Sequence, residues 1–254
     1  MTDEVPIRDA ATVVLLRDGA QGIEVWLLTR VRQMAFGAGM SVFPGGRVDA
    51  DDEHLPLHGA DVANIAARFD CAEPFARGLL GAAVREIFEE TGVLVTVPPA
   101  DLSAARADVE SGRVAFGDLL RDHGLAVDAG SLRPWSRWVT PAGEVRRYDA
   151  RFFIAALPEG VDASAVTTEA SGAEWVPVGT AIEQAQRGER GFMPPTIATL
   201  ESLQQYPTVA DAMAASAARP LDAVRPELQV GADGSASVRM PDGTTAPVPP
   251  GLLR

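Results

Sequence analysis

The most informative stretch of the sequence runs Gly81-Ala82-Ala83-Val84-Arg85-Glu86-Ile87-Phe88-Glu89-Glu90-Thr91-Gly92-Val93. Its first part belongs to a longer segment, residues 74–90, that is typical of a helix. Pro74 suits the first turn of such a helix, and Gly92 suits the position after its last turn. At about 100° per residue, the three glutamates fall within an arc of about 100° on one helix face, and the apolar side chains of the stretch, with Leu80, take the opposite face. Three carboxylates are therefore directed at one place.

These glutamates belong to the last helical turn, where the helix dipole disfavours negative charge. A solvated acidic face is the ordinary explanation for such a run of charge. The position favours another explanation, in which a hard divalent cation, Mg²⁺ or Mn²⁺, offsets the charge and holds the phosphate oxygens of a substrate. The residues by themselves leave both explanations open.

Residues 85–93 resemble the C-terminal half of the Nudix box, G-x5-E-x7-R-E-U-x-E-E-x-G-U with U apolar, and fill every specified position of that half. The N-terminal half departs from the pattern. If Gly46 is the box glycine, Arg85 follows it by 39 residues, 25 more than the pattern allows. The resemblance thus implies an insertion within the box, which we place at residues 47–72. Arg77 stands where the pattern has glutamate, so that glutamate is either missing or displaced to Glu73.

Further stretches are similar to the Nudix-19-like branch, which is related to the coenzyme A diphosphatases. They are Phe43-Pro44-Gly45-Gly46, residues 135–141, residues 146–153 and Pro194-Pro195-Thr196. The resemblance spans roughly residues 8–210. It implies an α+β protein, a Nudix-type α/β/α sandwich with a mixed sheet, an insertion within the box and extra C-terminal helices. We expect a Nudix hydrolase domain at 8–215 and a C-terminal extension at 216–254.

Hydrophobic patterning also predicts mixed strands and helices without strict alternation. Two runs, 11–16 and 24–29, predict a hairpin. The other predicted strands are 93–97, 132–140, 151–157, 174–177 and 237–239, and the other predicted helices are two at 100–123, one at 180–187 and one or two at 196–216. Residues 47–70 are acidic and irregular, then weakly helical, and we expect deletion of 50–70 to change substrate preference more than folding.

The resemblance also implies roles for single residues. Glu86, Glu89 and Glu90 are the expected ligands of Mg²⁺ or Mn²⁺, with the Gly46 carbonyl as a backbone ligand. The catalytic base is Glu86 or Glu89, or Glu169 from a distal loop. For Glu169, a solvated loop residue is the competing interpretation.

Five arginines complete the candidate site. Arg85 is expected to orient the carboxylates. Arg30 and Arg47 flank the glycine loop and are candidates for phosphate binding. Arg147 and Arg151 belong to an aromatic strand, where a cation and a ring could lie beside a nucleotide. A surface ion-pair cluster is the alternative for this second pair.

The charge balance restricts the partners. The chain has 254 residues, a net charge of −13 and 22 basic residues, all of them arginine. Such a protein lacks the basic character of a non-specific nucleic-acid or anionic-membrane binder. The single cysteine, Cys71, forms no intramolecular disulfide, and we see no signal peptide or apolar span of bilayer length, so we expect a cytoplasmic protein.

The resemblance implies metal-dependent hydrolysis of a phosphoanhydride bond in a nucleoside diphosphate linked to another group, with coenzyme A or acyl-CoA as substrate. ADP-ribose, a dinucleotide or a nucleoside triphosphate is the enzymatic alternative, because substrate pockets lie in loops outside the box. The replacement at Arg77 suggests a third interpretation, a nucleotide-binding module whose catalysis has lapsed. A homodimer is compatible with the resemblance, since members of this superfamily often dimerise.

Overall fold

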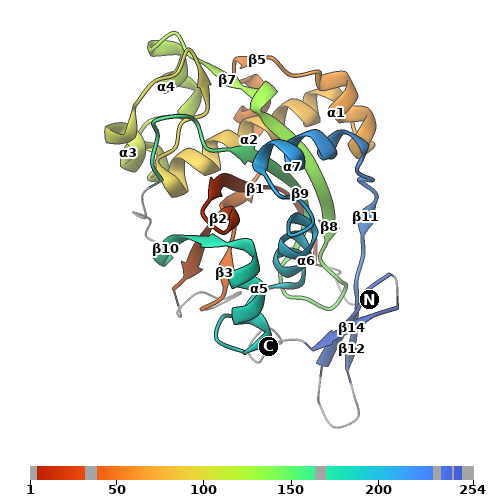
Figure 1. Cartoon of the computed structure of the whole chain (residues 1–254). Coiled ribbons are helices and arrows are strands. Elements are labelled where there is room, and N and C mark those ends of the chain that lie inside the picture. The colour runs from red at the N-terminus through yellow and green to blue at the C-terminus, as the bar shows by residue number, and fades with distance from the viewer. Residues whose placement is uncertain (1–4, 32–38, 164–169, 231–235, 242, 248–254) are drawn as a thin grey trace.

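The computed structural model describes residues 5–31, 39–163, 170–230, 236–241 and 243–247. Its main sheet has eight strands in the order β10-β2-β1-β9-β8-β11, with β3 paired to β2 and β4 paired to β1 (Figure 1). The strands are β1 (Ile7–Gly19), β2 (Gly22–Arg30), β3 (Ser41–Val42), β4 (Gly45–Arg47), β8 (Leu132–Val139), β9 (Arg147–Ala156), β10 (Ala170–Pro177) and β11 (Ala223–Val224). Because β9 runs parallel to β1 and antiparallel to β8, the sheet is mixed.

Helices cover both faces of this sheet. Alternate residues of β1 enter different cores, since Val13 and Leu15 belong to one buried cluster and Val14 and Leu16 to the other. This alternation follows from the two-residue period of a strand. The first cluster packs against α1 (Val62–Phe69), α2 (Glu73–Thr91), α3 (Arg106–Glu110) and α4 (Phe116–Asp122), and the second against α5 (Val178–Gln186), α6 (Pro194–Leu203) and α7 (Val209–Ala215). The expected α+β class and α/β/α sandwich are confirmed.

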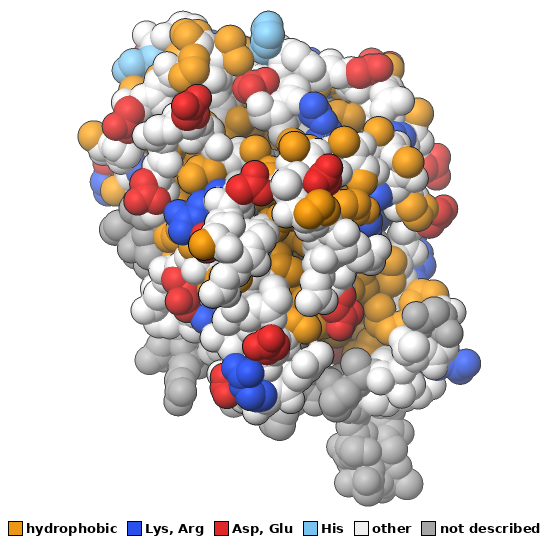
Figure 2. Space-filling model, viewed as in Figure 1, with side chains coloured by type: hydrophobic (Ala, Val, Ile, Leu, Met, Phe, Trp, Pro, Cys, Tyr) orange, Lys and Arg blue, Asp and Glu red, His pale blue; other side chains and the backbone are white. Residues whose placement is uncertain are grey.

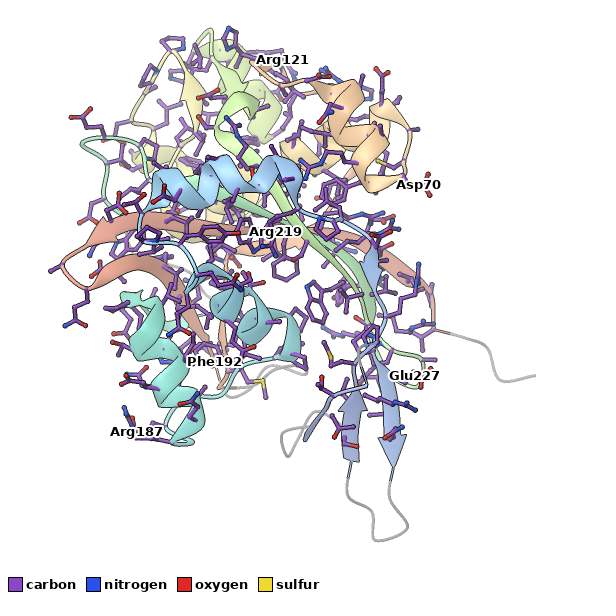
Figure 3. All side chains as sticks on the ribbon, turned by 45° about the vertical axis from the view of Figure 1, so that its right-hand side comes forward. Asp70, Arg121, Arg187, Phe192, Arg219 and Glu227 are labelled. Carbon is purple, nitrogen blue, oxygen red and sulfur yellow. The ribbon has the colours of Figure 1, made fainter. Side chains whose placement is uncertain are left out.

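The remaining elements are short. Two three-stranded sheets have the orders β5-β7-β6 and β12-β13-β14, and the second projects from the body of the molecule with Glu227 at its base (Figure 3). Their strands are β5 (Leu57–His58), β6 (Thr96–Val97), β7 (Ala126–Asp128), β12 (Glu227–Val230), β13 (Ala236–Arg239) and β14 (Thr245–Pro247). The 3-10 helices are η1 (Ala50–His54), η2 (Ser103–Ala105), η3 (Ala129–Ser131) and η4 (Ser216–Ala218).

Most predicted elements are present with shifted ends. The hairpin of β1 and β2 turns at Gly22, whose φ of +97° favours glycine. The strand expected at 93–97 is reduced to Thr96–Val97. Val93 to Val95 are buried in the first core cluster without belonging to a strand. A short apolar run in a sequence does not show whether it forms a strand or a buried loop.

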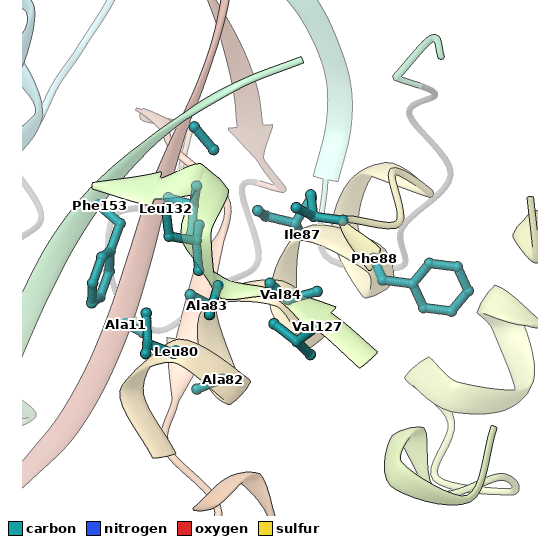
Figure 4. Packing of buried hydrophobic residues seen from close by; sticks show 14 of the residues in the cluster. Ala11, Leu80, Ala82, Ala83, Val84, Ile87, Phe88, Val127, Leu132 and Phe153 are labelled. Atoms are coloured by element: carbon teal, nitrogen blue, oxygen red, sulfur yellow. The ribbon is translucent and has the colours of Figure 1, made fainter. Parts of the chain in front are cut away.

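Helix α2 lies at the centre of the first core cluster. Its predicted apolar side chains, among them Leu80, Val84 and Ile87, are fully buried. Figure 4 shows them beside Leu132 and Phe153 of the sheet. The helix ends at Gly92, which has a φ of +76° and donates its N–H to the Phe88 carbonyl at 2.9 Å. The packing and this cap set where the last helical turn lies.

The segment 47–72 packs directly on α2. Leu55 and Phe69 are buried in the first core cluster, and α1 and η1 both contact α2. Arg77 of α2 donates to the carbonyls of Glu53 at 3.2 Å and Leu55 at 3.1 Å. This packing contradicts the expectation that deleting 50–70 would change substrate preference more than folding, because deletion would remove core side chains and uncover one side of α2.

Charged side chains are interspersed over the surface. On the face shown in Figure 2, arginines lie among aspartates and glutamates and do not gather into a basic patch. Within the described ranges, no helix combines the length and apolar character needed to cross a bilayer.

A matched pair of glycine substitutions tests the contact between α2 and η1. A Cβ on Gly81 would lie 2.3 Å from the Asp52 carbonyl oxygen, whereas a Cβ on Gly179, in α5, would meet its nearest neighbour at 3.9 Å. We expect Gly81→Ala to lower the free energy of unfolding by about 1–3 kcal/mol. Gly179→Ala should leave it unchanged or raise it by up to about 1 kcal/mol. Urea denaturation measures both, and equal effects would contradict the packing described here.

Candidate active site

A cavity of about 950 Å³ opens beside the C-terminal end of α2. The helix contributes one wall, and β4 lies next to it. The remaining walls come from the turn between β8 and β9, the start of α6 and the C-terminal extension. The side chains that line it include Arg85, Glu86, Glu89, Glu90, Arg30, Arg47, Glu144, Arg147, Trp138, Met193, Pro226 and Val238.

Two glycines let the glutamates approach the backbone of β4. Gly46 pairs with Ala11 of β1, and a Cβ on Gly46 would lie 2.3 Å from Glu86 Oε1. A Cβ on Gly45 would lie 2.6 Å from the Ala11 carbonyl oxygen. The Gly45 N–H donates to Glu90 Oε2 at 2.9 Å. Gly46 is thus required by the close approach of β4 to Glu86 of α2, and Gly45 by the close approach of β4 to β1.

Arg85 is the centre of the polar contacts at this end of α2. Its Nε and Nη2 donate to the two carboxylate oxygens of Asp52, each at 2.9 Å. Its Nη1 donates to Glu86 Oε1 at 2.8 Å and to Glu89 Oε1 at 3.4 Å. Nη2 also donates to the Arg47 carbonyl at 2.8 Å. Arg85 therefore contacts Glu86 and Glu89 directly, as its expected orienting role requires.

Burial changes the acidity of the glutamates. It raises the pKa of Glu86 from the usual 4.5 to about 7, and the charge of Glu89 acts in the same direction while Arg85 opposes both. Burial also raises the pKa of Glu89. Groups with perturbed pKa values that line a cavity are typical of functional sites.

The other predicted residues have different positions. Arg30, Arg47 and Arg147 line the cavity. The Nε of Arg30 is buried and has no hydrogen-bond partner among the described residues. Arg151 does not line the cavity: it is buried, pairs with Asp9 and lies 4.9 Å from the Phe75 ring centroid.

Glu169 lies outside the described residues. Two acids that the sequence analysis did not single out contribute to the site. Glu144, in the turn between β8 and β9, lines the cavity, and burial raises its pKa. Asp52 is 3% exposed and contacts Arg85. Glu144 has no sequence signal, since it is a lone acid in a turn, whereas Asp52 follows Gly46 by six residues, the spacing of the acid in G-x5-E.

Comparison with known proteins identifies the family. The family model described as "NUDT19 Nudix domain" matches residues 73–203, slightly more than half of the chain. The chain belongs to the NUDT19-type Nudix hydrolase family. The resemblance inferred from the sequence is thereby confirmed.

Similar proteins agree with this assignment. A crystal structure of a Nudix hydrolase from Alicyclobacillus acidocaldarius is 31% identical, with a TM-score of 0.71 over 83% of this chain and 96% of that one. "Putative nudix hydrolase 7" of Caenorhabditis elegans is 27% identical over 205 residues, or 78% of this chain and 61% of the relative. Human "Acyl-coenzyme A diphosphatase NUDT19" is 26% identical over 242 residues, 76% of this chain and 63% of that protein. The chain thus spans under two thirds of these two curated relatives.

Nudix enzymes generally use divalent metal ions, and the residues of this site fit one by their chemistry. Glu86, Glu89 and Glu90 supply carboxylate oxygens and Gly46 a carbonyl, which are ligands that Mg²⁺ and Mn²⁺ prefer. Within the described ranges, no three acidic, histidine or cysteine side chains converge as a ready-made cation site. The glutamates instead contact Arg85 and the Gly45 N–H, so an ion would compete with those contacts.

The raised pKa of Glu86 predicts a pH dependence of stability in metal-free protein. Between about pH 4.5 and 7 the folded state retains a proton that the unfolded state releases, so this group lowers stability as pH rises through that window. Glu86→Gln removes the effect. We therefore expect the free energy of unfolding of this variant, relative to wild type, to be larger at pH 7.5 than at pH 5.

Urea denaturation in the presence of a chelator measures this difference. The matched control is Glu73→Gln, which changes an exposed glutamate in the first turn of the same helix. It should follow the wild-type pH profile. A Glu86→Gln profile parallel to wild type would show that Glu86 ionises normally.

Proposed function

We propose that this Nudix protein hydrolyses a phosphoanhydride bond in a nucleoside diphosphate linked to another group, with coenzyme A or acyl-CoA as its preferred substrate. The observation that carries the proposal is the joint placement of Glu86, Glu89 and Glu90 on one wall of a cavity of about 950 Å³ that Arg30 and Arg147 also line. Carboxylates for a cation and guanidinium groups for phosphates thus meet in one space.

In the proposed reaction, Glu86, Glu89, Glu90 and the Gly46 carbonyl would hold the divalent cation. When bound, Mg²⁺ or Mn²⁺ neutralises charge on the two adjacent phosphates. Arg85 keeps the carboxylates of Glu86 and Glu89 in place. A water attacks one phosphorus, the bridging oxygen leaves with the other phosphate, and a carboxylate takes the proton of the water. Glu86, Glu89 and Glu169 are the candidates for that base.

Guanidinium groups would bind the substrate phosphates. Arg30 has a buried Nε that lacks a partner among the described residues, and it lines the cavity. Arg47 and Arg147 line the same space, although Arg147 also donates to the Thr140 carbonyl at 3.3 Å. We assign Arg151 no contact with substrate, because its partners lie elsewhere.

One wall of the cavity is apolar, which favours a substrate whose diphosphate is linked to a bulky group. Trp138 comes from β8, Met193 precedes α6, and Pro226 and Val238 belong to the C-terminal extension at 216–254, and all four line the cavity. The extension is joined to the main sheet through β11, which pairs with β8. An acyl-CoA, whose diphosphate is joined through the polar pantetheine arm to an apolar acyl chain, matches this division into a charged and an apolar side.

The proposal is tested by a hydrolysis panel. Coenzyme A, an acyl-CoA, ADP-ribose, NADH and a diadenosine polyphosphate are each supplied with Mg²⁺ or Mn²⁺, and products are identified by mass. We expect cleavage of the diphosphate of coenzyme A or acyl-CoA with the highest kcat/KM. A preference for ADP-ribose or a dinucleotide would replace the substrate assignment. No turnover of any compound with either ion would support a nucleotide-binding module.

Glu90→Gln tests the metal assignment. The amide oxygen can still accept the Gly45 N–H, so we expect a folded protein, but the loss of one charged ligand should lower kcat on the order of 10²-fold. Glu201→Gln, which changes an exposed glutamate of α6, should retain wild-type kcat. Near-normal turnover by Glu90→Gln would remove Glu90 from the metal site.

Arg30→Met tests phosphate binding while keeping an unbranched side chain. Loss of one charge-assisted hydrogen bond should lower kcat/KM by about 10- to 100-fold. Arg121→Met is the matched control, because Arg121 is exposed on α4 and pairs with Asp118. Equal effects of the two substitutions on the best substrate of the panel would contradict the role of Arg30.

A further inference from the structure

We propose that Glu144, in the turn between β8 and β9, recognises the nucleobase of the substrate and binds the amino-bearing edge of a 6-aminopurine such as adenine. This inference rests on the proposed function, because it assigns a partner to the nucleoside part of the substrate which that function requires. It concerns the choice of base and leaves the metal and phosphate chemistry to other residues.

Glu144 is a buried acid without a partner. It is 8% exposed and lines the cavity. Within the described ranges, its side chain makes no hydrogen bond and no ion pair, and burial raises the pKa of its carboxyl. Removing a carboxyl from water without supplying a partner costs free energy of folding. A ligand that enters the cavity would supply the missing contacts, so the carboxyl is suited to binding it.

Apolar surroundings restrict the ligand. Pro226 and Val238 of the C-terminal extension line the same cavity, and Val238 is 7% exposed. The extension lies against the turn, since a Cβ on Gly143 would be 3.7 Å from Leu228 Cδ2. A lone carboxyl among apolar side chains matches a group with apolar faces and a polar edge. A nucleobase is such a group, whereas a ribose carries hydroxyls around its ring.

The turn that carries Glu144 is closed by the strands on either side. The Thr140 N–H donates to the Tyr148 carbonyl at 2.9 Å, and the Tyr148 N–H donates to Thr140 Oγ1 at 3.0 Å. Tyr148 also lines the cavity, and its ring offers a face on which a base can stack. A base bound here leaves the wall formed by Trp138 and Met193 to the linked group.

Hydrogen-bond chemistry selects the kind of base. A raised pKa enlarges the neutral fraction of the Glu144 carboxyl, which then offers one acceptor and one donor. Adenine is complementary to this pair, because its 6-amino group donates and the neighbouring ring nitrogen accepts. Guanine presents two adjacent donors, the N1–H and the 2-amino group, and these match an ionised carboxylate instead.

Equilibrium binding of nucleoside monophosphates tests the base assignment without turnover. AMP, GMP and purine riboside 5′-monophosphate, which lacks the 6-amino group, are titrated into the full chain with Mg²⁺ and followed by NMR. We expect AMP to bind about 10-fold more tightly than purine riboside monophosphate. Equal affinity for these two, or tighter binding of GMP than of AMP, would overturn the proposal.

Two substitutions at Glu144 connect that preference to the carboxyl. Glu144→Met removes both hydrogen-bonding atoms, so AMP affinity should fall about 10-fold and the preference for the 6-amino group should disappear. Glu144→Gln retains an acceptor and a donor and should restore the preference. Glu159→Met is the matched control, because Glu159 is exposed and does not line the cavity. A wild-type preference in Glu144→Met would overturn the proposal.

Stability separates a residue kept for a ligand from one kept for the fold. Glu144→Met replaces an unpaired buried carboxyl with an apolar side chain, so the urea midpoint of the ligand-free variant should equal or exceed that of wild type. A lower midpoint combined with wild-type AMP affinity would give Glu144 a structural role and overturn the proposal.

Kinetics separate base recognition from catalysis. On the best substrate of the panel, Glu144→Met should raise KM about 10-fold and lower kcat much less, because the contact is made to a part of the substrate that does not react. Loss of kcat in Glu144→Gln at unchanged KM would make Glu144 a catalytic base and overturn the proposal.

Failure of the proposed function is distinguishable from failure of this inference. If wild-type protein hydrolyses no compound of the panel but prefers AMP through Glu144, the hydrolase assignment fails and base recognition is supported. If the wild type hydrolyses a compound of the panel and Glu144→Met binds AMP as wild type does, this inference alone fails.

Discussion

The buried guanidinium of Arg85 is the interaction on which this site depends. It contacts three acids, Asp52, Glu86 and Glu89, and a backbone carbonyl of β4, and its side chain is 12% exposed. Acids brought so close together repel one another and lose hydration, and a buried charge is tolerated only when it is paired and hydrogen-bonded. One arginine does not neutralise three carboxylates, and burial keeps the pKa of Glu86 raised against the opposing charge of Arg85. The remaining negative charge is what makes the end of α2 suited to a divalent cation.

Steric constraints on three glycines make that charge arrangement possible. Gly45 and Gly46 let β4 lie between β1 and the glutamates, and Gly81 lets η1 lie against the other side of α2. At Gly46 and Gly81 a single methyl group would come within 2.3 Å of an oxygen atom. The helix is consequently held between two backbone segments, and its acidic end is fixed relative to both. Rigid support of this kind is what a precise electrostatic site requires.

The distribution of cavity residues explains how a family site can be adapted to one substrate. The glutamates and glycines come from the motif, whereas the apolar wall comes from β8, the start of α6 and the C-terminal extension. Trp138, Met193 and Val238 are far apart in sequence and meet only at the cavity. Segments outside the motif thus set the shape of the space in which the linked group would lie.

Local patterns in the sequence were sufficient for the helix at 74–90, the hairpin, the α+β class and the three glutamates on one face, because these depend on residues a few positions apart. Alternation along β9 also indicated that Arg151 and Phe153 share a face, but not that this face is turned toward Asp9 and Phe75 and away from the cavity. Asp52 and Arg85 are 33 positions apart, and Arg30 and Glu144 reach the cavity from separate strands and turns. Only the tertiary structure decided these contacts, since they depend on the path of the insertion and the order of the strands, which no local period encodes.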